Sequence, residues 1–467
     1  MKRIVQDLVS RGLGYPLALP LRDGEVRRAR RLVAAKRAAA FDSPEAMRAA
    51  QEERLRALLA HCAKTVPYYR QLFAAAGYDP AAPDARREFH RLPVLTKDLI
   101  SERGEDLLSE AARSSRLYPN SSGGSTGRMV SFYQDQRYRD HFLASLWASN
   151  QMQGWRYGSR VAVLWGAPRD VTELQRPRAR LRLYVENTRF FDAFDMTPAR
   201  MEDCHRSLSE FAPDLIVAYA SSIHLFARYL EQRRTECRYP RVSIISSAEM
   251  LTPEMRDQIG RVFHVPVFDR YGSREVGVIA SECGAHEGLH VNVSDLYLEC
   301  VDDAGRPVPE GTPGELAVTV LNNYAMPFLR YRIEDVGIFS SAPCACGRRS
   351  PRIRKLLGRS SDVIVGAGGR LIHGEYFTHL FYGLPQIRQF QFVQESRDRF
   401  RLLVVPGEGF TMDMTRPLES EMKDVLGESA RVTWDLVSRI PPLPSGKHRF
   451  TVSHVVAEPA GNRQEAW

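Results

Sequence analysis

Short apolar segments alternate with stretches of helix length from Arg160 onward, and this alternation constrains the fold more than any other feature of the sequence. A helix between consecutive strands is the usual connection between parallel neighbours in a sheet. The pattern therefore predicts βαβ units, a parallel sheet and an α/β fold class. The apolar segments are Val161 to Trp165, Leu215 to Tyr219, Val242 to Ile245 and Val265 to Phe268.

The composition is that of an ordinary globular chain. The chain has 467 residues, of which 43% are hydrophobic and 26% charged, and this length suits two or three domains. Because no run of about 18 apolar residues occurs, we expect no membrane-spanning helix. Charges and Gln interrupt the start of the chain, so we expect no secretory signal and a cytoplasmic location.

The net charge of +9 comes mainly from arginines that are spread along the chain. A diffuse basic surface attracts anionic substrates, and we favour this interpretation over nucleic-acid binding. We therefore expect no nucleic acid and no membrane among the partners. A monomer and a homodimer are both compatible with the sequence.

The first part of the chain predicts helices. We expect residues 1–115 to form a helical region at the start of the N-terminal domain, because segments such as Ala46 to Cys62 repeat apolar residues at helical spacing. The segment Leu92 to Ile100 predicts a loop followed by a helix that Thr96 caps.

Two later changes of pattern predict further units. Closely spaced strands and turns over about 289–340 predict a β-barrel-like subdomain. After Gly358 the sequence mixes strands and helices, which predicts a small α+β domain. The expected division is therefore a large N-terminal domain over 1–358 and a small, mobile C-terminal domain over 359–467.

Residues 118–132 contain a short turn, rich in glycine and hydroxyl side chains, that precedes an apolar segment of β type. Glycines permit positive φ, and successive N–H groups can then form an anion-binding nest. Arg128 follows Gly127 where a Walker-type loop has Lys. A flexible linker or a plain hairpin would have a similar composition. The candidate phosphate-binding residues are Ser121, Ser122, Gly123, Gly124, Ser125, Thr126 and Gly127.

Four further motifs follow this turn in a fixed order. They are Phe268-Asp-Arg-Tyr-Gly-Ser-Arg-Glu275, Leu329-Arg-Tyr-Arg-Ile-Glu-Asp335, Gly358-Arg-Ser-Ser-Asp362 and Pro444-Ser-Gly-Lys447. Together with the turn they resemble the adenylate-forming enzymes, the superfamily of acyl-CoA synthetases, peptide-synthetase adenylation domains and luciferases. Within it, Tyr68-Tyr69, Leu92 to Ile100 and Ser246 to Glu249 are similar to the phenylacetate-CoA ligase-like, or CapK-like, branch.

The resemblance implies a site for ATP and Mg²⁺. The turn would hold the β- and γ-phosphates, and Glu275 would help to hold Mg²⁺, a hard cation that prefers carboxylate and phosphate oxygens. Lys447 would be the second catalytic residue, bridging the substrate carboxylate and the α-phosphate. The residues implied for adenine are Ser247, Ala248, Glu249 and Tyr271, and those for ribose and phosphate are Asp335 and Arg359. Gly272 and Ser273 are also implied to bind ATP or AMP.

Plain structural alternatives exist for several of these residues. Glu275 could be a surface residue after a strand, and Asp335 and Arg359 could form salt bridges at a domain boundary. By resemblance, the small domain rotates about a hinge just after Arg359 and exchanges adenylation for thioester formation. Ser361 occupies the hinge position at which the family usually has an acid or Lys.

Cysteine and histidine residues in two segments have the spacing of a metal site. Cys283, His286 and His290 lie in one segment, and Cys344 and Cys346 form a CxC pair in another. Three thiolates and one imidazole fit a tetrahedral structural Zn²⁺, and resemblance to CapK-like sequences favours His290 over His286 as the fourth ligand. Unlinked buried cysteines are the alternative. An odd total of seven cysteines argues against a disulfide framework.

The resemblance implies activation of a small-molecule carboxylic acid, expected to be aromatic, through an acyl-adenylate, with transfer to a thiol, expected to be that of CoA. An amide-forming synthetase and a carrier-protein-loading enzyme are the alternatives, followed by a non-catalytic homologue. A strand that ends in small residues before a helix leaves a crevice at the edge of a parallel sheet. The candidate acid-pocket residues are Tyr219, Ala220, Ser222 and His224, although packing of Tyr219 and His224 in the core would also explain them.

Overall fold

The computed structural model describes residues 24–82, 85–122, 130–165, 183–192, 198–359, 363–366, 371–373, 377, 380–381, 384, 386–441 and 449–455. The described residues divide into two compact units. The first contains those up to Ile333 and Ile338–Lys355, and the second contains Glu334–Gly337 and those from Leu356 onward. The predicted boundary after Gly358 and the mobility of the small domain stay predictions. No helix within these ranges is long and apolar enough to cross a membrane.

Helices form the first part of the chain, as its periodicity predicts. Ser43 caps α4 by accepting a hydrogen bond from the N–H of Ala46 at 3.2 Å, and Thr96 caps α7 in the same way through the N–H of Leu99 at 3.3 Å. The predicted Thr96 cap is therefore confirmed. The helices are α3 (Glu25–Ala39), α4 (Pro44–Thr65), α5 (Pro67–Ala76), α6 (Ala85–Glu88) and α7 (Lys97–Leu107), with 3₁₀ turns at Phe89–Arg91 and Glu110–Ala112.

A buried arginine attaches the segment before α7 to the rest of the first unit. Arg330 forms an ion pair with Glu299 at 3.0 Å, with side-chain exposures of 1% and 7%. Its guanidinium also donates to the carbonyl oxygens of His90, Leu92 and Gly305. These bonds satisfy the buried charge and fix the entry into α7.

The main sheet has eleven strands in the order β10-β11-β12-β13-β9-β8-β7-β6-β5-β3-β4. Five adjacent strands are parallel to one another: β3 (Val161–Trp165), β4 (Thr188–Asp192), β5 (Leu215–Ala218), β6 (Ser243–Ser247) and β7 (Val267–Ser273). The predicted parallel sheet is confirmed.

The β-rich stretch after β7 continues this same sheet. The strands are β8 (Gly277–Glu282), β9 (Leu289–Val291), β10 (Leu296–Val301), β11 (Pro313–Val320), β12 (Tyr331–Ser340) and β13 (Arg352–Arg359). A tight turn reverses the chain between β7 and β8, which pair antiparallel, and β8 then pairs antiparallel with β9. The sequence pattern separates these strands from the parallel set, whereas backbone hydrogen bonds join them to it.

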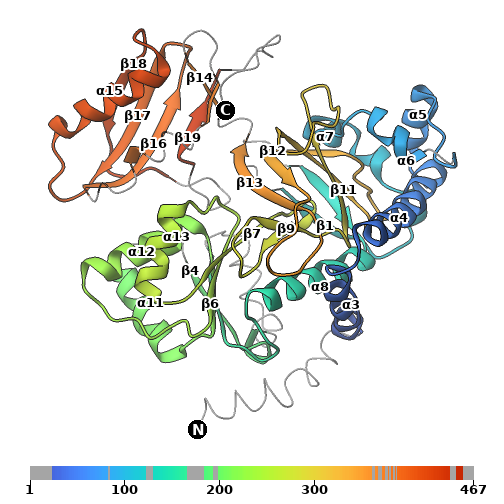
Figure 1. The fold of residues 1–467 in the computed structure, drawn as a ribbon, viewed down its shortest axis with the longest axis horizontal. Coiled ribbons are helices and arrows are strands. Elements are labelled where there is room, and N and C mark those ends of the chain that lie inside the picture. The colour runs from blue at the N-terminus through green and yellow to red at the C-terminus, as the bar shows by residue number, and fades with distance from the viewer. Residues whose placement is uncertain are drawn as a thin grey trace. The chain divides into compact units, whose positions relative to one another are not determined.

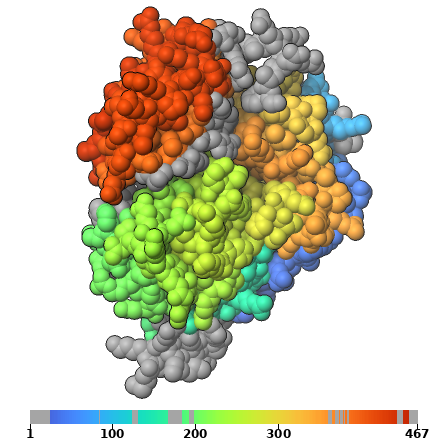
Figure 2. Space-filling view, turned by 60° about the vertical axis from the view of Figure 1, so that its left-hand side comes forward, coloured from blue at the N-terminus to red at the C-terminus, as the bar shows by residue number. Residues whose placement is uncertain are grey.

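Helices α11 (Pro198–Phe211), α12 (Ala220–Gln232) and α13 (Pro253–Phe263) lie beside the parallel strands and form the green surface of this region (Figures 1 and 2). The buried residues Ile223, Phe226, Ala227 and Leu230 recur at helical spacing on α12. Phe226 packs against Phe263 of α13 with ring centroids 6.1 Å apart. Helix α8 (Gln136–Met152) follows the hairpin of β1 (Tyr118–Ser121) and β2 (Ser131–Gln134).

The second unit is α+β, in agreement with the predicted fold class. Its four-stranded sheet has the order β18-β17-β16-β19. Helix α15 contributes Leu418, Met422 and Leu426 to a core that contains Phe392, on which Phe377 stacks at 4.0 Å. The elements are β14 (Val363–Val365), β15 (Leu371–His373), β16 (Ile387–Gln394), β17 (Arg399–Pro406), α15 (Thr415–Leu426), β18 (Arg431–Leu436) and β19 (Thr451–Ser453), with a 3₁₀ turn at Met412–Met414.

Candidate functional site

Four adjacent parallel strands, β3, β5, β6 and β7, end at one edge of the main sheet. Ligands of open α/β sheets usually bind at this edge, beyond the carboxyl ends of the strands. Aromatic and polar residues end or directly follow these strands, namely Trp165, Tyr219, Ser247 and Ser273.

Trp165 and Tyr219 stack on each other at this edge. Their ring centroids are 4.1 Å apart and the ring planes are tilted by 32°. The register explains the contact, because Leu164 pairs with Ala218 and the next residues are Trp165 and Tyr219. Sequence reasoning singled out Tyr219 and missed Trp165, although both follow from aligning the ends of the two predicted strands.

The candidate acid-pocket residues lie at the beginning of α12. Tyr219, Ala220 and Ser222 are buried. Burial, assisted by the nearby Arg228, lowers the pKa of His224 to about 4, so its imidazole is neutral at pH 7. Walls of a substrate pocket and packing of the core both fit this burial, and the assignment stays a prediction.

The turn after β6 connects three elements of the site. The carboxylate of Glu249 accepts a hydrogen bond from the N–H of Ser221 at 2.8 Å, which places a negative charge at the first turn of α12. The hydroxyl of Ser247 donates to the carbonyl of Arg270 on β7 at 3.2 Å. Between them Ala248 has a left-handed φ of 71°. The proposed adenine residues of this turn are thus held by strand β7 and by helix α12.

The turn from Tyr271 to Glu275 requires a glycine. A Cβ atom at Gly272 would lie 2.4 Å from the carbonyl oxygen of Gly277, closer than any side chain tolerates. Beyond the turn, Glu275 is 9% exposed and accepts a hydrogen bond from the hydroxyl of Tyr331 at 3.5 Å. This burial excludes the alternative of a freely solvated surface glutamate.

The hairpin β1–β2 lies beside the Glu275 turn, because the side-chain amide of Gln134 donates to the carbonyl of Arg274 at 3.3 Å. Ser122 closes the end of the hairpin: its N–H donates to the carbonyl of Val130, and its hydroxyl accepts from the N–H of Val130, both at 2.9 Å. Residues Gly123 to Gly127 lie outside the described residues.

Other predicted nucleotide and catalytic residues are distributed as follows. Asp335 lies on β12, and Arg359 is the last residue of β13. Ser361 and Lys447 lie outside the described residues. Their assignments stay predictions.

A second cluster contains Cys283, His290, Cys344 and Cys346, whose ligand atoms all lie within 4.8 Å of one another. The Sγ atoms of Cys283 and Cys344 are 3.7 Å apart, and Cys346 Sγ lies 3.3 Å from His290 Nε2. A tetrahedral zinc ion with Zn–S bonds of about 2.3 Å separates two sulfur atoms by roughly 3.8 Å. The four side chains are therefore spaced as a closed tetrahedral site requires.

The surroundings of the cluster suit metal ligation. Burial lowers the pKa of His290 to about 4, so the imidazole is neutral, and its Nδ1 is 3.1 Å from the hydroxyl of Ser350. Burial opposes ionisation of Cys346, but hydrogen bonds from the backbone and side chain of Arg348 lower its pKa. Burial raises the pKa of Cys283 to about 12, so metal binding there would release a proton. Sequence reasoning missed Arg348 and Ser350.

His286 takes part in a different arrangement. Its ring stacks on Phe268 with centroids 5.1 Å apart, and its Nδ1 lies 3.0 Å from an Nη of Arg256 and 3.3 Å from Glu282. The structure thus brings His290, rather than His286, to the three sulfur atoms. Of the other cysteines, Cys62, Cys237 and Cys300 are buried and Cys204 is half-buried.

Comparisons with known proteins agree with this architecture. A family model described as the CapK C-terminal domain matches residues 364–454. Protein CapK of Staphylococcus aureus is 25% identical over 371 residues, which cover 78% of this chain and 80% of that protein. Phenylacetate-coenzyme A ligase of Thermus thermophilus is 27% identical over 331 residues, covering 69% and 73% of the two chains.

Among solved structures, 2-hydroxyisobutyryl-CoA ligase in the postadenylation state, in complex with R3-HIB-AMP, matches with a TM-score of 0.71 at 18% identity. The match covers 88% of this chain and 90% of that chain. The chain is thus similar in sequence to CapK and to the phenylacetate-coenzyme A ligases, and its fold is that of 2-hydroxyisobutyryl-CoA ligase.

Proposed function

We propose that this homologue of CapK and of the phenylacetate-coenzyme A ligases is an AMP-forming acid–thiol ligase that activates a small carboxylic acid with ATP and transfers the acyl group to CoA. One observation carries the proposal. The turns after β6 and β7, with Glu249 and Glu275, and the aromatic pair Trp165–Tyr219 all lie at the carboxyl edge of one parallel sheet.

The reaction has two balanced steps. A carboxylate oxygen of the acid attacks the α-phosphorus of ATP, and the bond to the bridging oxygen breaks, so pyrophosphate leaves with the electron pair. The thiol of CoA then loses its proton to solvent and its sulfur attacks the carbonyl carbon of the acyl-adenylate, and AMP leaves with the electron pair of the broken C–O bond. Both steps bring anions together, so positioning and charge neutralisation are what the protein must contribute.

The residues of the site suit these demands. We assign the phosphates to the turn from Ser121 to Gly127, because the strands that flank it in the sequence form a hairpin that is fixed beside the Glu275 turn through Gln134. When bound, Mg²⁺ would neutralise phosphate charge, and Glu275, held by the hydroxyl of Tyr331, offers it a preoriented carboxylate. Ser247 to Glu249 and Tyr271 to Ser273 would hold the adenine.

Other roles rest on the resemblance of the motifs. Asp335 would accept hydrogen bonds from the ribose hydroxyls, with Arg359 near the ribose and phosphate. Lys447 would neutralise charge between the carboxylate and the α-phosphate. We assign the acid to the region of Trp165 and Tyr219, since two aromatic rings in contact make this edge of the sheet apolar, which suits an aromatic acid.

The cluster of Cys283, His290, Cys344 and Cys346 would hold a structural Zn²⁺. Four protein ligands leave no open position for substrate or water, so the ion would stabilise the fold without taking part in the reaction. The ligand thiols must stay reduced, and for this reason we expect the protein to work in a reducing compartment such as the cytoplasm.

The acceptor can be tested directly. An amine would give an amide and a carrier-protein thiol would give an acylated carrier; both reactions start from the same adenylate. A panel of aromatic and aliphatic acids, assayed for pyrophosphate release with and without CoA, identifies the activated acid. Mass spectrometry of the product identifies the acceptor, and sedimentation of the same protein tests for a homodimer. If none of the acids in the panel leads to pyrophosphate release, the proposed activity is contradicted.

A further inference from the structure

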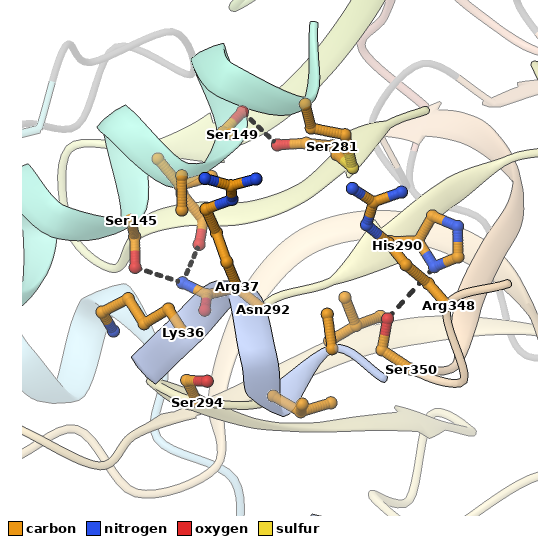
Figure 3. A pocket seen from close by; sticks show the side chains of 16 residues that line it. Lys36, Arg37, Ser145, Ser149, Ser281, His290, Asn292, Ser294, Arg348 and Ser350 are labelled. Carbon is orange, nitrogen blue, oxygen red and sulfur yellow. Dashed lines mark hydrogen bonds between the residues drawn. The ribbon is translucent and has the colours of Figure 1, made fainter. Parts of the chain in front are cut away.

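A cavity of about 90 Å³ lies in the first unit. Its walls come from the end of α3, one face of α8, the strands β8 and β9, and the loop that carries Arg348 and Ser350 (Figure 3). None of the residues proposed to bind the nucleotide or the acid lines it. Because a single water needs about 10–15 Å³ of such volume, the cavity has room for a small molecule.

Hydroxyl groups line one side of the cavity. The Oγ atoms of Ser149 and Ser281 are 2.7 Å apart (Figure 3), and that bond uses one of the two hydroxyl hydrogens. The second hydrogen is available to an acceptor in the cavity. Ser350 is already hydrogen-bonded to His290 at 3.1 Å.

Lys36 also lines the cavity, but its charge is neutralised. Its Nζ forms a buried ion pair with Asp295, and it lies 3.3 Å from Nδ1 of His141. Burial lowers the pKa of Lys36, whereas the contact with Asp295 opposes that shift. The net charge inside the cavity therefore depends on the remaining basic residues.

Arg37 and Arg348 supply that charge. Both side chains line the cavity, Arg37 from the end of α3 and Arg348 from the loop before β13 (Figure 3). Within the described part of the chain, neither forms an ion pair with a carboxylate, and the contacts of Arg348 are with the ring of Phe41, 5.1 Å away, and with Cys346. Arg37 is exposed to solvent and Arg348 is half-buried, so solvent screens their mutual repulsion in part, and an anion between them would reduce it further.

We propose that this cavity binds one small oxyanion, a phosphate or a carboxylate, between Arg37 and Arg348. Each guanidinium presents a planar fork of N–H donors that matches two oxygens of such an anion. The free hydroxyl hydrogen of the Ser149–Ser281 pair donates a further bond. The anion would join the end of α3 to the loop of the cysteine cluster.

The test uses full-length, zinc-loaded protein titrated with inorganic phosphate, and separately with acetate, at constant ionic strength in a calorimeter. We expect saturable binding of at least one of the two anions, and their relative affinities distinguish a phosphate site from a carboxylate site. Arg37→Gln should weaken that binding about tenfold or more, which corresponds to the loss of a charge-assisted hydrogen bond.

Arg31→Gln is the matched control, since Arg31 is an exposed arginine on the same helix, and it should leave the affinity unchanged. Phosphate bound at the nucleotide site would be insensitive to either substitution. Absence of saturable binding, or equal affinities in the Arg37→Gln and Arg31→Gln proteins, would overturn the proposal. The readout is binding alone, so it does not depend on acyl-adenylate formation.

Discussion

The sulfur atoms of Cys283 and Cys344 lie 3.7 Å apart although 61 positions separate the two residues in the chain. Cys283 follows the end of β8, and Cys344 belongs to the loop between β12 and β13. The pairing of β9 with β13, in which His290 is opposite Arg352, brings the two segments together. A metal ion bound here would link the segment after β8 to the loop between β12 and β13.

Zinc content is the first prediction. Purified protein should carry about one zinc per chain, and Cys344→Ser should lower both the zinc content and the melting temperature, because metal binding contributes to folding free energy. Elemental analysis and thermal unfolding measure the two effects. Cys204→Ser, at a cysteine outside the cluster, should retain the metal. If protein purified without chelators contains no zinc, the assignment of this cluster as a zinc site is wrong.

Lys447 gives the second prediction. Lys447→Ala should slow adenylate formation by roughly 10²-fold or more, because the transition state loses one electrostatic stabiliser. Thioester formation from a supplied acyl-adenylate should change much less. Pyrophosphate release and CoA-thioester formation, measured separately, test the difference. Equal losses in the two half-reactions would refute the exchange of domain orientations.

The third prediction concerns Glu275. Glu275→Gln should reduce kcat/KM for MgATP by roughly 10²-fold, since the neutral amide is a weaker ligand for a hard cation. Tyr331→Phe removes the hydroxyl that lies 3.5 Å from this carboxylate but keeps its charge. It should have a smaller effect, about tenfold or less. Steady-state kinetics over a range of Mg²⁺ concentrations compares the two, and a normal Mg²⁺ dependence in Glu275→Gln would exclude this residue as a ligand.

The fourth prediction locates the acid pocket. Ala220→Phe should raise the KM for the acid while the KM for ATP changes little, because the added ring would fill the space at the start of α12. Ala227→Phe is the matched control: Ala227 is equally buried on the same helix, one heptad further on. Both variants should lose stability through overpacking, by about 1–3 kcal/mol. If both leave the acid KM unchanged, the pocket lies elsewhere.

The buried pair Arg330–Glu299 gives a prediction about stability. Arg330→Met should lower the free energy of unfolding by about 3–5 kcal/mol, because Glu299 then keeps an uncompensated buried charge. Three backbone carbonyls also lose their donor. Arg48→Met breaks an exposed pair with Glu45 and should change stability by less than about 0.5 kcal/mol. Urea denaturation of both variants measures the two changes in stability. Similar urea midpoints for Arg330→Met and Arg48→Met would contradict this prediction.

Much of the architecture was predictable because it follows from local patterns. The four apolar segments from Val161 to Phe268 correspond to parallel strands, and Thr96 caps its helix. Such features depend on neighbours within a few residues, so the sequence alone carries them. The CxC spacing of Cys344 and Cys346 is also a local pattern, and by itself it indicates a metal site.

The tertiary structure decided the relations between distant segments. The sequence separated the β-rich stretch around 289–340 from the parallel strands, whereas backbone pairing joins it to their sheet. Trp165 gained its aromatic partner from the register of β3 and β5. Arg330 gained two of its three carbonyl partners, His90 and Leu92, from a segment more than two hundred positions earlier. A local pattern reports which face of a segment is buried. Which segment covers that face depends on the packing free energy of the whole chain, so the packing partner can be identified only in the folded structure.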